Sequence, residues 1–70
     1  MNNILRVDRM RVEIEELRNS MWRLMDFIYD SPEYDLLERC EKVNLIKQLN
    51  AMECYERTLA KRIFWAVSKK

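Results

Sequence analysis

The chain has 70 residues, a formal net charge of +1 and 49% hydrophobic residues, and it contains no glycine and no histidine. The absence of glycine excludes phosphate-binding loops of the P-loop or dinucleotide type, and the absence of histidine removes the commonest general base and metal ligand. A folded chain of this length forms one domain and buries only about 60% of the surface that its unfolded form exposes. Since a lone helical hairpin cannot cover this much apolar surface, we expect copies of the chain to associate.

The first predicted element is a long amphipathic helix over residues 4–29. Apolar residues recur there at alternating spacings of three and four, which is the period of a helix that packs against another helix. This first seam consists of Val7, Met10, Ile14, Leu17, Met21, Leu24 and Ile28.

A break follows at Asp30–Glu33. Either Asp30 or Ser31 can cap a new helix, Pro32 suits the first helical position, and Glu33 has the spacing of a capping box with Asp30. We therefore expect a short helical turn over residues 32–38.

A second long helix is predicted over residues 41–68. Its seam consists of Leu45, Leu49, Met52, Glu56, Leu59, Ile63 and Ala66. Two helices of similar length with a short connection pack antiparallel. The sequence therefore predicts an all-α fold for residues 1–70: an antiparallel helical hairpin, with a short helical turn between two long helices, that assembles into a homo-oligomeric bundle.

Glu56 is the charged member of the second seam. Pairing with a cation across the hairpin, such as Arg9 or Arg11, is the favoured interpretation. A place at a solvent-accessible groove or a role in fixing helix register are alternatives. Catalysis is disfavoured because no second acid, metal or nucleophile accompanies Glu56.

Several large apolar residues lie outside the two seams. Residues 63–67 are apolar on all sides, so a single neighbouring helix cannot cover them. We expect the subunit interface to use Trp22, Met25, Phe27, Phe64 and Trp65.

Charge is divided unevenly along the chain. Residues 26–41 carry six acids against Arg39, whereas all charged residues after Glu56 are basic. An antiparallel hairpin then has an acidic closed end and a basic open end. Complementation of the helix dipoles is the simpler explanation. The functional alternative is an anion site in which an aromatic ring stacks on a base, formed by Arg9, Arg57, Lys61, Arg62 and Trp65.

Cys40 and Cys54 are fourteen residues apart, which corresponds to about 21 Å on one helix and is too far for a disulfide. We expect two buried or half-buried free thiols in a reducing compartment. Without histidine or a CxxC spacing, a metal site is not expected, and the residues indicate no cofactor and no enzymatic activity. Without a signal peptide or an 18-residue apolar run, we expect no membrane association and a cytoplasmic location.

One ordered set of residues runs through most of the chain: Arg9, Glu13, Glu15–Leu17, Leu24–Ile28, Ser31–Tyr34, Leu45–Tyr55 and Leu59–Ile63. In these residues the chain resembles a group of very small helical proteins common in tailed bacteriophages. Some phage proteins of this type act as oligomeric sponges for the cyclic-nucleotide or cyclic ADP-ribose signals of bacterial immunity. The resemblance implies a counter-defence protein in the host cytoplasm that sequesters such a signal where the basic ends of neighbouring chains meet.

Two other functions are compatible with the same residues. An amphipathic helix face can bind a host defence protein directly, as an anti-CRISPR-like inhibitor would. The hairpin can also be a purely structural assembly module.

Overall fold

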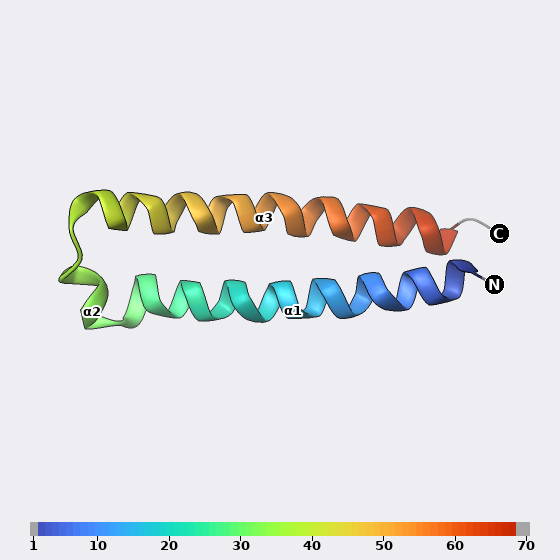
Figure 1. Cartoon of the computed structure of the whole chain (residues 1–70), viewed down its shortest axis with the longest axis horizontal. Helices are drawn as coiled ribbons and strands as arrows, with labels where there is room; N and C mark the ends of the chain where they lie inside the picture. The colour runs from blue at the N-terminus through green and yellow to red at the C-terminus, as the bar shows by residue number, and fades with distance from the viewer. Residues whose placement is uncertain (1, 69–70) are drawn as a thin grey trace.

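The computed structural model describes residues 2–68, and the side chains of residues 5–68. Helix α1 spans Asn2–Asp30, α2 spans Pro32–Asp35 and α3 spans Arg39–Ser68. Figure 1 shows α1 and α3 side by side and antiparallel, with α2 at the end where the chain turns back. We call that end the closed end, and the end where α1 begins and α3 ends the open end. The molecule is a rod of 51 × 15 × 13 Å.

Ser31 and Pro32 separate α1 from α2. Ser31 has an extended backbone, as expected for the residue before proline, and its hydroxyl oxygen accepts a hydrogen bond from the Glu33 amide at 3.2 Å. Of the two candidate caps, the structure therefore selects Ser31. Helix α2 ends at Asp35, three residues earlier than expected, and α3 begins at Arg39, two residues earlier than expected.

The core lies between α1 and α3 and follows the two seams. Buried side chains come from both helices, and Leu59 is fully buried with 0% exposure. All fourteen seam residues are buried or half-buried, including Glu56. The most buried cluster consists of Val7, Met10, Ile14, Leu59 and Ala66, with Ala60 and Ile63 packed against it. Since these residues are nearest the open end, that half of the hairpin has the denser core.

Aromatic contacts hold the closed end together. The rings of Phe27 and Tyr34 meet edge to face with centroids 6.1 Å apart, and Lys42 Nζ lies 5.5 Å from the Tyr34 ring centroid. Phe27, which the sequence assigns to a subunit interface, is therefore half-buried against its own chain.

The rod shape leaves much of the chain exposed. Its radius of gyration is 15.7 Å, whereas a compact domain of this length has about 11 Å. Among the described residues, no helix is both long enough and apolar enough to cross a membrane.

Candidate functional site

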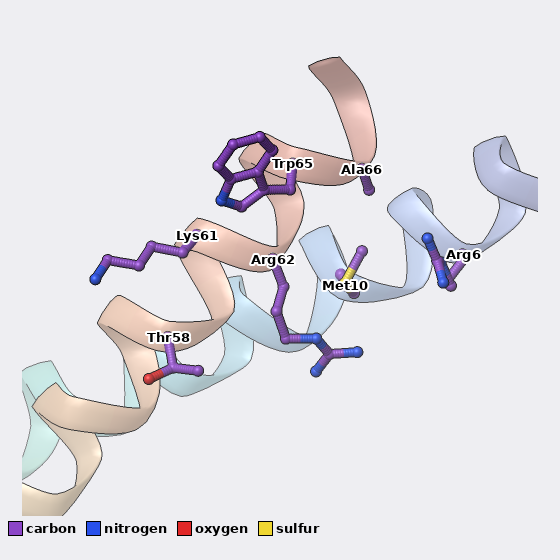
Figure 2. A pocket seen from close by; sticks show the side chains of 7 residues that line it. All are labelled: Arg6, Met10, Thr58, Lys61, Arg62, Trp65 and Ala66. Carbon is purple, nitrogen blue, oxygen red and sulfur yellow. The ribbon is translucent and has the colours of Figure 1, made fainter. Parts of the chain in front are cut away.

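A shallow depression of about 320 Å³ lies at the open end, between α1 and α3. We call it the basic groove; its lining residues are Arg6, Met10, Thr58, Lys61, Arg62, Trp65 and Ala66. Figure 2 shows Arg62 reaching from α3 toward Met10 of α1, whereas Lys61 and Trp65 lie on the outer side of α3. The described lining residues include three cations and no carboxylate.

Helical periodicity explains which side chains meet in the basic groove. Thr58, Arg62 and Ala66 follow each other at intervals of four, so they form one row along α3. Lys61 and Trp65 form the neighbouring row, again four residues apart. Arg6 comes from α1 and lies four residues before Met10.

Trp65 presents its indole to solvent. Its side chain is 64% exposed, and its ring meets the Phe64 ring edge to face with centroids 5.9 Å apart. An exposed indole beside cations is a surface on which a nucleobase stacks while the cations neutralise phosphates.

The structure gathers three of the five ligand-binding residues that the sequence predicts. Lys61, Arg62 and Trp65 line the basic groove, whereas Arg9 and Arg57 are exposed outside its lining. Each of these two arginines precedes a lining residue by one position, and one position turns a helix by about 100°. Arg6, Met10, Thr58 and Ala66 are lining residues that the sequence prediction of the site missed. Four-residue spacing from Arg62 is the signal that would have found Thr58 and Ala66, whereas Arg6 and Met10 lie on the other helix, whose register the spacing does not fix.

Helix dipoles do not account for the division of charge in α1. This helix has no acid in its first turn and no base in its last turn, within the described part of the chain. Asp30 instead occupies its final position. Glu41 in the first turn of α3 does fit the dipole explanation. The dipole of α1 therefore does not explain why the open end is basic.

A second groove lies on another side of the hairpin, around Trp22. Two adjoining depressions share Arg18 and Trp22 there; one of about 430 Å³ includes Arg11 and Glu15, and one of about 260 Å³ includes Met25 and Glu56. We call them together the neutral groove, because the charges of Arg11 and Arg18 equal those of Glu15 and Glu56.

The ion pair in the neutral groove corrects the sequence prediction for Glu56. Its Oε2 accepts a hydrogen bond from Arg18 Nε at 2.8 Å and lies 2.8 Å from Arg18 Nη2. The partner is therefore Arg18, not Arg9 or Arg11. Arg9 and Arg11 do not pair with Glu56 because they lie near the open end, whereas Glu56 lies midway along α3.

The two cysteines are free, but the expectation that they are buried or half-buried is wrong. Cys40 and Cys54 are both exposed. Neither belongs to a seam, so both point away from the partner helix. Among the described residues, no group of three or more cysteines, aspartates and glutamates is placed to hold a metal ion.

Comparison with known proteins places the chain in a family. Residues 6–64 match the family model Sequestin, a range that includes Arg6, Lys61 and Arg62 and ends one residue before Trp65. Neither a curated protein nor a solved structure gives a significant match. Because the family model covers most of the chain, including nearly all of both long helices, the chain belongs to the Sequestin family.

Proposed function

We propose that this protein is a non-enzymatic counter-defence protein of a phage, which sequesters a cyclic-nucleotide or cyclic ADP-ribose signal in the host cytoplasm. The family name suggests sequestration of a ligand. The observation that carries the choice of ligand is the basic groove, where three cations and an exposed indole surround one open depression. The protein acts as a homo-oligomer, because each copy exposes more apolar surface than a stable monomer of this size can leave in water.

The basic groove has the parts that a nucleotide signal requires. Arg62 has a planar fork that bonds two phosphate oxygens at once, and Lys61 supplies a compact positive charge on a flexible stem. Trp65 offers a ring face to a base. At about 320 Å³, the groove is at the lower end of the size range of small-molecule sites. Because it is also open, part of the ligand stays outside it.

Binding of this kind favours sequestration over catalysis. Charge neutralisation and base stacking bind a nucleotide as tightly as they bind the transition state of a reaction of that nucleotide. Interactions that are equal in both states lower the free concentration of a ligand without speeding its conversion. The ligand is therefore expected to leave the protein unchanged.

A calorimetric screen with cyclic dinucleotides and cyclic ADP-ribose tests the proposal. We expect one of them to bind and to raise the melting temperature, since a ligand that binds the folded state stabilises it. The bound ligand should be recovered intact by chromatography after the protein is denatured.

Matched double variants locate the site. Lys61→Ala with Arg62→Ala should weaken binding by at least about tenfold, because each charged hydrogen bond contributes about 1.5–3 kcal/mol. Arg39→Ala with Lys47→Ala removes the same residue types from the same helix outside both grooves, and should leave the affinity unchanged.

Equal losses in the two double variants would mean that only net charge attracts the ligand. If every nucleotide fails to bind while the purified chain binds a host defence protein, the anti-CRISPR-like alternative replaces this proposal.

A further inference from the structure

The neutral groove belongs to a face that carries large exposed side chains on α1. Trp22 is 63% exposed and Tyr29 is 72% exposed. They are seven residues apart, which is close to two helical turns, so they lie on the same face of α1. Both lie between the middle of the rod and the closed end.

The same side of the hairpin carries a second apolar patch on α3. Glu56 lines the neutral groove together with Trp22, which fixes the side of α3 that faces this groove. Val67 follows Glu56 by eleven residues and is turned about 20° from it, and Phe64 follows by eight residues and is turned about 80° in the same sense, so Phe64 lies toward the solvent edge of that side. Phe64 is 64% exposed and Val67 is 48% exposed, and both lie near the open end.

The two patches are arranged almost symmetrically about the Arg18–Glu56 ion pair. Tyr29 follows Arg18 by eleven residues toward the closed end, and Val67 follows Glu56 by eleven residues toward the open end. Each is therefore about 16 Å from the ion pair along the rod, in opposite directions. Trp22 lies about 6 Å and Phe64 about 12 Å from it, again in opposite directions.

The exposed area matches what a second copy would cover. The accessible surface of the chain is 5837 Å², whereas a compact monomer of 8.7 kDa has about 4,700 Å². The excess of about 1,100 Å² is close to the roughly 800 Å² that each partner contributes to a standard interface.

Charge complementarity selects the orientation of the second copy. The closed end carries six acids and one base, Arg39, within residues 26–41, and the open end carries five bases and one acid, Asp8, within residues 5–12 and 61–68. A parallel pair would place like charges together, whereas a head-to-tail pair places each acidic end beside a basic end.

We propose that a second copy of this chain docks head to tail on the face of the neutral groove, with a two-fold axis near the Arg18–Glu56 ion pair. The patch of Trp22 and Tyr29 on each copy then lies at the level of the patch of Phe64 and Val67 on the other. The basic groove, which is lined from another side of α3, stays open near each end of the pair. The inference deepens the homo-oligomer part of the proposed function, and its test does not depend on any nucleotide.

Matched tryptophan variants test which face is covered. Trp22 and Trp65 have nearly equal exposure but line different grooves. Sedimentation equilibrium of Trp22→Ala should show self-association weakened by roughly a thousandfold, because the two-fold pair loses two aromatic anchors at once and each contributes about thirtyfold. Trp65→Ala should weaken self-association by no more than a few-fold, because it removes only the ring that Phe64 contacts within its own chain. Circular dichroism checks that both variants keep their helix content.

The two exposed cysteines report the orientation. A spin label on Cys40 in a Cys54→Ser variant, and one on Cys54 in a Cys40→Ser variant, give the distances between copies by electron resonance. Cys40 and Cys54 precede Glu56 by sixteen and two residues, so a head-to-tail pair separates them along the rod by about 48 Å and about 6 Å. A parallel pair gives two similar, short distances.

A long Cys40 distance with a short Cys54 distance supports the proposal. Short distances for both labels, a monomer at all concentrations, or equal weakening by both tryptophan variants would each overturn it. Nucleotide binding measured on the same samples keeps the outcomes separate, because the basic groove can bind its ligand whether or not this pairing is correct.

Discussion

The two grooves of this protein contain the same kinds of residue but differ in electrostatics. Each has an exposed tryptophan four residues after a cation, Lys61 before Trp65 and Arg18 before Trp22. In the basic groove the described lining residues include no carboxylate. In the neutral groove Glu56 holds Arg18 through a 2.8 Å contact.

This difference shows how a neighbouring carboxylate changes what a cation and an aromatic ring can bind. A cation that is already paired attracts an anionic ligand weakly, so the indole beside it is left as an apolar surface. Lys61 and Arg62 lie in a groove whose described lining includes no carboxylate, so these two cations keep their attraction for phosphate. This difference supports the proposals that the basic groove binds the ligand and that the neutral groove contacts a second copy.

The largest expected effect comes from breaking the core that supports both grooves. Leu59→Ala removes a fully buried side chain and should lower the free energy of unfolding by about 2–5 kcal/mol. Urea denaturation monitored by circular dichroism measures this loss. Leu36→Ala is the control, because Leu36 is 83% exposed and its truncation should change stability by less than about 0.5 kcal/mol. Similar losses for both variants would contradict the assigned core.

A charge reversal in the basic groove should have the next largest effect. Arg62→Glu replaces the guanidinium that we propose binds phosphate by a carboxylate that repels it, and should weaken nucleotide binding by about a hundredfold, or about 2.7 kcal/mol. Arg23→Glu makes the same change at an exposed position of α1 outside both grooves. Isothermal calorimetry should find its affinity within a few-fold of the natural chain. A similar loss in both variants would show that the grooves do not differ in the way we describe.

The smallest expected effect concerns the ion pair in the neutral groove. Arg18 is 52% exposed and Glu56 is 20% exposed, so solvent screens much of their attraction. A double-mutant cycle with Arg18→Gln and Glu56→Gln should give a coupling free energy of about 0.2–1 kcal/mol. Denaturation of the four proteins at one common protein concentration measures it. A coupling near zero would mean that the pair does not neutralise Arg18 in solution.

The helical seams show how much of the fold can be predicted from sequence. An unbroken spacing of three and four residues fixes which side of each helix is buried, and all members of both seams are buried or half-buried. Ser31 and Pro32 likewise locate the turn, because proline removes the amide that would continue α1.

The details of the sites depend on register, which the seams do not fix. The position of Glu56 opposite Arg18 follows from where α2 ends and α3 begins, and this could not be read from spacing alone. The same uncertainty explains why Lys61, Arg62 and Trp65 could be predicted as site residues whereas Arg6, on the other helix, was missed.

Fluorescence of single-tryptophan variants tests the central claim most directly. Trp22→Phe leaves Trp65 as the reporter, and Trp65→Phe leaves Trp22, while each position keeps an aromatic ring. On titration with the cyclic nucleotide that the screen identifies, we expect quenching in the variant that retains Trp65 and an unchanged signal in the variant that retains Trp22. Quenching of Trp22 with a silent Trp65 would contradict the assignment of the ligand to the basic groove.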